Sequence, residues 1–396
     1  MPSMALDFLL FDPRLLPATD ILSQYKKPHF ASRFKQTLSV SLYCPFGKFI
    51  STVWQEEKME RIFYIFFEEL CLQLNRDGLQ TRHSRKNARD HLNSIISGIC
   101  DGQNLAPEES ARLAVETAIH FHRDEKAKNS QICLMGTFHN ILYIALKASW
   151  DWSVTDSSVV CSLLGEIYSC ERTFERLFLG AIFGTSAPYF IAGWKSDFRD
   201  QDENSRAMVY FLEHASRRRI EFPVHAGEQN NPRMTRFIDV PIESCGMASP
   251  LRVTLQAGAP DILLILLRYG ANPNPTDGGS SAIIALLDKL LESKDRRYPY
   301  QLEACLKILM RAVPFIDLPF KPYTFDVRKE VFMTKYWTLI KDGLLTDDQI
   351  GGVSLLKHLA RCAIRQRLRE TGKLPSGIKT FGLPRHLRRY IDLMED

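Results

Sequence analysis

The residues of this chain that could do chemistry are few, and their spacing argues against a catalytic site. His120 and His122 are two residues apart, so on a helix their imidazoles point to different faces, and no cysteine or carboxylate set beside them has metal-ligand spacing. Cys245 follows Ser244, but the sequence places no histidine to activate its thiol. Gly278-Gly279 lacks the flanking strand and helix start that phosphate binding needs. We therefore expect no catalytic residue, no metal and no cofactor.

The cysteines indicate the compartment. Nine of them are scattered singly, with no CxxC pair. An odd number without a framework, mostly among apolar neighbours, is typical of reduced thiols in an intracellular protein. We expect a cytoplasmic protein, with the nucleus as an open alternative. The same pattern excludes a built-in RING, so any ligase role would need a borrowed catalytic subunit.

Composition and charge exclude two further classes of partner. Hydrophobic residues at 45% and charged residues at 24% are globular values. The formal net charge of +5 is mild for 396 residues, and the basic clusters at 82–86 and 217–219 are short, so we expect no nucleic-acid binding. The longest uncharged run, 177–194, is interrupted at 184–188, which predicts a buried helical corner and no membrane helix.

Most of the chain has the apolar periodicity of helices, which predicts an all-α fold. Prolines punctuate residues 1–50, so we expect an irregular N-terminal segment there. An α-helical array should follow at 51–184, and a bridging helix segment is expected at 317–350. The helices predicted in the array are 56–74, which is dense in aromatic residues, 109–121, 132–148, and the pair 159–168 with 173–183.

The segment 248–274 has the signals of two helices joined by a tight turn. Ser249-Pro250 caps and starts the first helix, Gly258 permits the turn, and Gly270 ends the second helix in the left-handed conformation. Between them, 262–267 is apolar on most faces because neighbours cover it. This segment resembles an ankyrin repeat nearly end to end. One repeat cannot bury its own faces, so the resemblance implies a helical solenoid with further repeats.

Neighbouring segments repeat the pattern less regularly. Residues 281–287 resemble another inner helix and 302–311 its outer helix, with a charged insertion at 292–297. Upstream, 185–194 and 206–215 resemble a third pair, followed by a long linker-like insertion at 217–247. We therefore expect degenerate ankyrin repeats with long insertions at 185–316. The array at 51–184 could be built from decayed pairs of the same kind.

The C-terminal residues 351–396 predict two short amphipathic helices. In the first, apolar residues recur between basic ones from Leu355 to Leu368; Leu383-Pro384 opens the second. The runs LLKHLARCAIRQRL and LPRHLRRYIDL resemble the two ends of a SOCS box, a family in which the first helix inserts a leucine into elongin C and a Leu-Pro segment contacts a cullin of the fifth type. Phe381-Gly382 departs from the first Leu-Pro that the family often has.

The resemblance assigns residues to both contacts. Leu356 matches the inserted leucine, and Ala360 stands where the family usually has cysteine. The implied elongin-binding residues are Leu355, Leu356, Leu359, Ala360, Cys362 and Ala363. The implied cullin-binding residues are Leu383, Pro384, Leu387 and Tyr390.

Ankyrin-like repeats followed by a SOCS-like box resemble the ankyrin repeat and SOCS box family. The resemblance implies a non-catalytic substrate-recognition subunit of a ubiquitin ligase, in which the solenoid binds an unknown target and the box binds elongin B, elongin C and a cullin with its RING subunit. One alternative is an ankyrin scaffold whose C-terminal hairpin caps the solenoid, with Leu355, Leu356 and Leu359 buried against 300–350. Another is an elongin-bound adaptor without a cullin.

Overall fold

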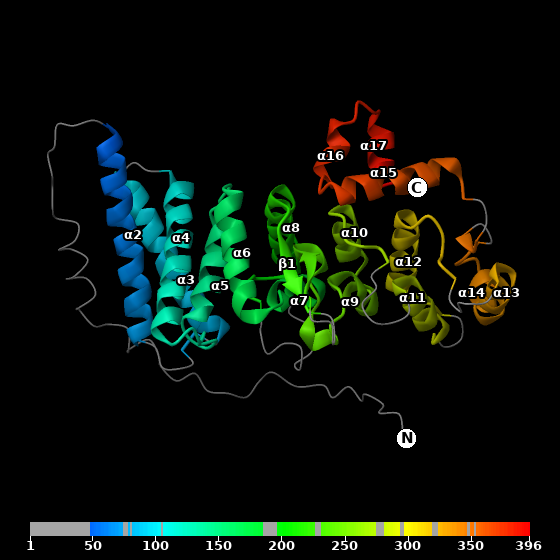
Figure 1. Ribbon diagram of the computed structural model, residues 1–396, viewed down its shortest axis with the longest axis horizontal. Coiled ribbons are helices and arrows are strands. Elements are labelled where there is room, and N and C mark those ends of the chain that lie inside the picture. Colours follow the sequence, from blue (N-terminus) through cyan, green and yellow to red (C-terminus); the bar gives the residue numbers. More distant parts are fainter. Residues whose placement is uncertain are drawn as a thin grey trace, which may run out of the picture. The chain divides into compact units, whose positions relative to one another are not determined.

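The computed structural model of the chain describes residues 48–73, 78–79, 81–103, 106–184, 196–225, 231–274, 281–293, 297–318, 324–346, 349–351 and 354–396. Within it, Gln55–Asp396 form one compact and mostly helical unit (Figure 1). Several sequence predictions lie outside the described residues: most of the irregular segment predicted at 1–50, the inner helix at 185–194, Gly278-Gly279 and the middle of the charged insertion at 292–297. Residues 48–50, which were also predicted to be irregular, are helical.

The part of α2 from Gln55 on and four further helices form the first part of this unit and stand side by side in Figure 1. They are α2 (Lys48–Gln73), α3 (Arg82–Gln103), α4 (Pro107–Lys128), α5 (His139–Asp151) and α6 (Ser157–Glu171). Helix α3 packs on α4 and α5, and α4 packs on α5 and α6. The phenylalanines at 63, 66 and 67 of α2 are buried as its composition predicts, and the Phe67 ring lies 5.9 Å from that of Phe121 on α4.

The next two helices, α7 (Glu175–Phe183) and α8 (Gln201–Arg218), pack on each other. The sequence paired 173–183 with 159–168, but α7 packs mainly against α8 and α9, because the buried face of α8, with Met208 and Phe211, supplies the apolar partner for α7. The apolar run at 177–194 breaks at Gly184, which has a φ of +58°. Within the described ranges, no helix is long and apolar enough to cross a membrane.

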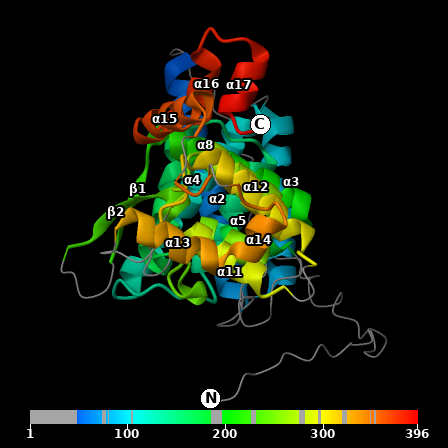
Figure 2. The same cartoon turned by 90° about the vertical axis from the view of Figure 1, so that its right-hand side faces the viewer.

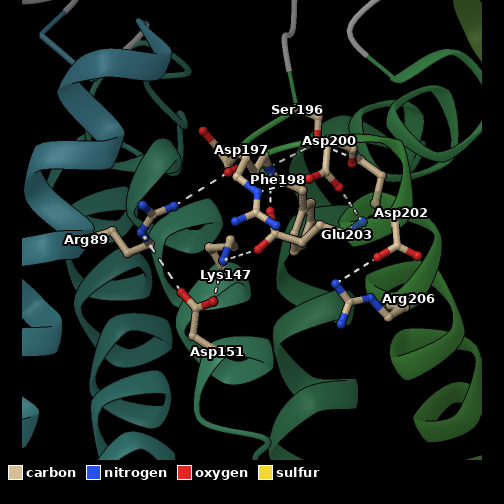
Figure 3. Close-up of polar contacts among 12 residues, drawn as sticks. Arg89, Lys147, Asp151, Ser196, Asp197, Phe198, Asp200, Asp202, Glu203 and Arg206 are labelled. Atoms are coloured by element: carbon tan, nitrogen blue, oxygen red, sulfur yellow. Dashed lines mark hydrogen bonds and ion pairs between the residues drawn. The ribbon is translucent and has the colours of Figure 1, made fainter.

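A polar network ties the ends of α3, α5 and α8 together (Figure 3). Lys147 of α5 is buried and pairs with Asp151 and, at 3.3 Å, with Glu203 of α8. Arg89 of α3 lies 4.0 Å from Asp151 and donates to the carbonyl oxygen of Asp197 at 3.5 Å. Because buried Lys147 has carboxylate partners, this network positions the helices and leaves no unpaired charge there.

The described part of the predicted linker at 217–247 contains a hairpin. Strands β1 (Glu221–Val224) and β2 (Arg233–Arg236) pair antiparallel, and the short turns η2 (Phe237–Asp239) and η3 (Glu243–Cys245) follow. Phe222 faces the core, with its ring 4.5 Å from Tyr168 and 5.1 Å from Phe174. These aromatic contacts hold the hairpin against the helices. The fold is therefore mostly helical, as predicted, with one small two-stranded sheet that the sequence did not indicate.

The repeat-like region forms two stacked helical pairs, with bounds close to the predicted ones. They are α9 (Pro250–Ala257) with α10 (Pro260–Arg268), and α11 (Ala282–Leu291) with α12 (Tyr300–Ala312). The Ser249 hydroxyl accepts a hydrogen bond from the backbone N–H of Arg252, and Gly258 and Gly270 have φ of +67° and +88°. Helix α9 packs on α11, and α10 packs on α12.

The bridging segment contains two consecutive helices, α13 (Phe325–Lys335) and α14 (Trp337–Lys341), where the sequence predicted a single packed helix. Phe332, Tyr336 and Leu339 are fully buried. The Tyr336 hydroxyl donates to Asp288 of α11 at 2.6 Å, which fixes the segment to the second helical pair. The chain then enters its last three helices, α15 (Leu356–Glu370), α16 (Ser376–Thr380) and α17 (Arg385–Ile391).

A candidate partner-binding face on the C-terminal helices

The first turn of α15 presents an apolar surface to solvent. Leu355, at the N-cap, is 78% exposed, Leu356 is 82% exposed and Leu359 is 37% exposed. The backbone carbonyl of Leu355 accepts hydrogen bonds from the N–H groups of His358 and Leu359, so the turn is helical although no side chain caps it. Adjacent exposed leucines leave apolar area in water, which is typical of a surface that another protein covers.

The opposite face of α15 is buried and unexpectedly basic. Arg361 and Arg365 are 5% and 6% exposed. Arg365 donates to the carbonyl oxygens of Ile391, at 2.9 Å, and of Leu267 on α10, at 2.5 Å. Burial lowers the pKa of Arg365 to about 10, so its guanidinium stays charged at pH 7 and the carbonyl oxygens stabilise that charge.

The three C-terminal helices share a small core of their own. Leu368 of α15, Leu374, Ile378 of α16 and Ile391 of α17 form one buried cluster, with Ile364 and Leu383 packed at its edge. The sequence predicted only two helices here, and α16 and Leu374 supply further apolar partners between them.

Besides the Arg365 contact with Leu267, further polar contacts dock this module on the helical pairs. Asp392 pairs with Arg268 of α10 at 2.6 Å, and Asp396 pairs with Arg311 of α12 at 2.5 Å. The His358 imidazole donates to the carbonyl oxygen of Val313 at 2.8 Å, and the Ser354 hydroxyl donates to that of Pro314 at 2.8 Å. Figure 1 shows α15 lying next to α10 and α12, and Figure 2 shows α15, α16 and α17 grouped together. The module is therefore held in one orientation against the array.

The residues assigned to elongin divide between the two faces of α15. Leu355, Leu356, Leu359, Ala360 and Ala363 are exposed, whereas Cys362 is buried. Cys362 lines, with Leu359 and Ala363, a groove of about 590 Å³ between α15 and the loops after α10 and α12. Burial raises the pKa of the Cys362 thiol. Its burial gives Cys362 a packing role and separates it from the exposed leucines.

The residues assigned to a cullin are less exposed. Pro384 is exposed, and Leu383 and Leu387 are half-buried. Tyr390 is buried, with Lys357 Nζ 3.9 Å and the Arg361 guanidinium carbon 4.1 Å from its ring centroid. These cation–π contacts make Tyr390 a packing residue that holds α17 on α15.

The other residues that the sequence singled out for possible chemistry are Cys245, His120 and His122. Cys245 is half-buried, and burial raises the pKa of its thiol, which is opposite to what a nucleophile needs. His120 is exposed and pairs with Glu60 at 3.2 Å, while His122 is buried, so their rings do point to different faces. Among the described residues, His122 belongs to a group of His and Cys side chains that could hold a metal ion. This group lies outside the C-terminal module.

Sequence reasoning missed the two buried arginines, because a basic residue on a helix usually faces water. Arg361, Arg365 and Leu368 recur at helical spacing on one stripe of α15. Since Leu368 was expected on the apolar face, that spacing was the available signal.

An amphipathic helix with an uncovered leucine turn, followed by two short helices that fold back on it, defines a protein-binding module. Comparison with protein families assigns the module: residues 352–392 match the SOCS box. A SOCS box suggests elongin B/C binding in a ubiquitin ligase adaptor role, and proteins that carry one are typically substrate receptors and not enzymes. The comparison shows no ankyrin repeat family in this chain. Comparisons with curated proteins and with solved structures gave no match.

Proposed function

We propose that this chain is the substrate-recognition subunit of an elongin–cullin–RING ubiquitin ligase. Leu355, Leu356 and Leu359 contact elongin C, with Ala360 and Ala363 beside them on the same helix. The exposure of these leucines carries the proposal, because a partner that buries them gains the free energy of apolar burial at no cost to the fold of this chain.

The same exposure bears on the competing scaffold hypothesis. A hairpin that only capped the array would bury Leu355, Leu356 and Leu359 against residues 300–350, yet the first two are more than three-quarters exposed. The buried face of α15 does cover the second helix of each repeat-like pair: Arg365 contacts Leu267 of α10, and His358 contacts Val313 at the end of α12. The module therefore combines a capping face with a free face, and only the free face needs an outside partner.

The target would bind to the helical array, which we propose to be a solenoid of ankyrin-like pairs. The stacking of α9 on α11 and of α10 on α12, together with the capped start of α9 and the left-handed glycine after it, supports this assignment for the two pairs. In such an assembly the chain acts by proximity: it holds the target near a ubiquitin-charged enzyme and does no covalent chemistry itself. We propose the cytoplasm as its site of action, with the nucleus as the alternative.

The cullin contact rests on less exposed surface. Pro384 is open to solvent, and Leu383 and Leu387 are half-buried, whereas Tyr390 is already covered by α15. A cullin of the fifth type would then contact Pro384 and its neighbours. If this surface is too small, the chain remains an elongin-bound adaptor.

Co-expression separates these possibilities. The full chain is purified with elongin B and elongin C, and the cullin with its RING subunit is then added. We expect wild type to retain both, Leu356→Asp to lose the elongins, and Pro384→Ala to keep the elongins but bind less cullin. Leu72→Asp, at a 75% exposed leucine on α2, is the matched control and should bind all partners. Retention of elongins by Leu356→Asp would contradict the proposal.

A further inference from the structure

Four ligand atoms converge inside the helical array, far from the SOCS box. They belong to His122 on α4, Cys133 in the loop that follows, His139 at the start of α5, and Cys170 near the end of α6. All four atoms lie within 4.8 Å of one another. Cys133 Sγ is 3.2 Å from His122 Nε2 and 3.2 Å from His139 Nδ1, and Cys170 Sγ is 3.8 Å from His122 Nε2.

These separations suit a tetrahedral ion. Zinc lies about 2.0–2.1 Å from imidazole nitrogen and about 2.3 Å from thiolate sulfur, which places the ligand atoms of a tetrahedral site about 3.3–3.8 Å apart. All three separations given above join a nitrogen to a sulfur, for which this geometry gives about 3.5–3.6 Å, and they lie within about 0.4 Å of that value. Two thiolates and two imidazoles form a donor set that favours zinc over calcium or magnesium, which prefer oxygen ligands.

The far nitrogen of each imidazole is held by a carboxylate. His122 Nδ1 lies 2.9 Å from Glu166 Oε1, and His139 Nε2 lies 2.8 Å from Glu171 Oε1. Glu171 also accepts a hydrogen bond from the Tyr143 hydroxyl at 2.6 Å. A carboxylate on the far nitrogen takes the ring N–H, so the nitrogen that faces the cluster carries a lone pair. A carboxylate on the far nitrogen is the usual outer partner of a metal-bound histidine. If the four side chains only formed hydrogen bonds with one another, there would be no reason for both imidazoles to have such a carboxylate.

Burial and charge agree with a closed site. Both imidazole rings are fully buried and both thiols are partly buried. Lys126 Nζ lies 3.6 Å from Cys170 Sγ, where a cation stabilises thiolate charge. Two thiolates also balance the charge of a divalent ion, so the buried site would be electrically neutral before its outer shell is counted.

We propose that His122, Cys133, His139 and Cys170 bind one structural Zn²⁺ ion. The ion would fasten the loop between α4 and α5 to three helices. That loop contains two non-glycine residues with positive φ, Ser130 at +55° and Gln131 at +65°, a conformation that its surroundings must hold in place. With all four ligands from the protein and none from solvent, the site is structural and not catalytic.

This proposal departs from the expectation of no metal. The spacing argument considered only residues near His120 and His122, whereas the partners of His122 are 11 and 48 residues further along the chain. The proposal does not depend on the SOCS box function, and its test needs no elongin.

The test is the metal content of the purified full chain by mass spectrometry, with alkylation of its cysteines before and after a strong chelator. We expect one zinc per chain, and protection of Cys133 and Cys170 that the chelator abolishes. Cys170→Ser should lose the zinc, whereas Cys245→Ser, at a half-buried thiol outside the cluster, should keep it. Replacement of zinc by cobalt should give the absorption of a tetrahedral thiolate site in wild type but not in Cys170→Ser.

Three results would overturn the proposal. The first is wild-type chain that is folded and zinc-free, with a melting temperature that added zinc leaves unchanged. The second is full zinc content in a soluble Cys170→Ser chain, which would place the ion elsewhere. The third is a disulfide between Cys133 and Cys170 in the native protein. Because the first and third results use wild type alone, misfolding of the variant cannot leave the question open.

Discussion

Truncation of Leu356 tests the partner-binding face quantitatively. The side chain is 82% exposed in the free chain, so Leu356→Ala removes few internal contacts and should change the free energy of unfolding by no more than about 0.5 kcal/mol. In the complex the leucine would be buried almost completely, which contributes about 1.5–3 kcal/mol. Since about 1.4 kcal/mol corresponds to a tenfold change in Kd, the variant should bind elongin B/C roughly 10- to 150-fold more weakly.

The assay is calorimetric titration of purified elongin B/C into the full chain, with thermal melting of each variant measured by circular dichroism. Leu72→Ala is the matched control, because this leucine is 75% exposed on α2, away from the SOCS box. It should leave both Kd and the melting temperature unchanged. An unaltered Kd for Leu356→Ala would refute the assignment of the exposed face. A large fall in its melting temperature would refute the structural reasoning, because it would mean that the leucine already packs within this chain.

Three further outcomes follow from the same contacts. Arg365→Ala should lower the free energy of unfolding by about 3 kcal/mol, because two buried carbonyl oxygens lose a charged donor. Arg367→Ala, at a 78% exposed side chain two residues further on, should change the free energy of unfolding by less than about 0.5 kcal/mol; urea unfolding compares the two variants, and equal effects would contradict the buried role of Arg365. Burial lowers the pKa of His358, and the neighbouring Arg361 guanidinium acts in the same direction, so the folded state favours the neutral imidazole and loses stability as the pH falls below about 6.5. In unfolding curves taken across this range His358→Gln should flatten the dependence of stability on pH, and an unchanged slope would assign that dependence to another group. Ser249→Ala should cost about 1 kcal/mol by removing the cap of α9, read as a lower urea midpoint at constant m-value, and an unshifted midpoint would argue against the cap.

Local signals predicted the repeat-like pairs and the SOCS box well. The signals for helix ends are local, because a cap, a first-turn proline or a left-handed turn involves only residues next to it in the sequence. The structure has helix ends where these signals predicted them, at Ser249-Pro250, Gly258 and Ser281. The box was recognisable because its leucines follow one helical face, and the family match at 352–392 lies within the predicted 351–396.

Long-range contacts could not be predicted in the same way. The hairpin at β1 and β2 depends on Phe222 meeting rings of α6 and α7 that are distant in sequence. The burial of Arg365 depends on carbonyl oxygens at Leu267 and Ile391, and nothing in the local pattern of α15 indicates them. The His and Cys cluster gathers from four separate segments, so a search for closely spaced ligands had no motif to find.

The guanidinium of Arg365 makes the SOCS box inseparable from the array beneath it. Its hydrogen bonds reach α10 on one side and the end of α17 on the other, so excising residues 354–396 would remove the Leu267 acceptor from a buried cation and uncover Leu374, which lies beside Gly270. The excised fragment should melt less cooperatively than the full chain. We therefore expect a chimaera that joins the box to an unrelated receptor to need α10 and α12 from this chain as well.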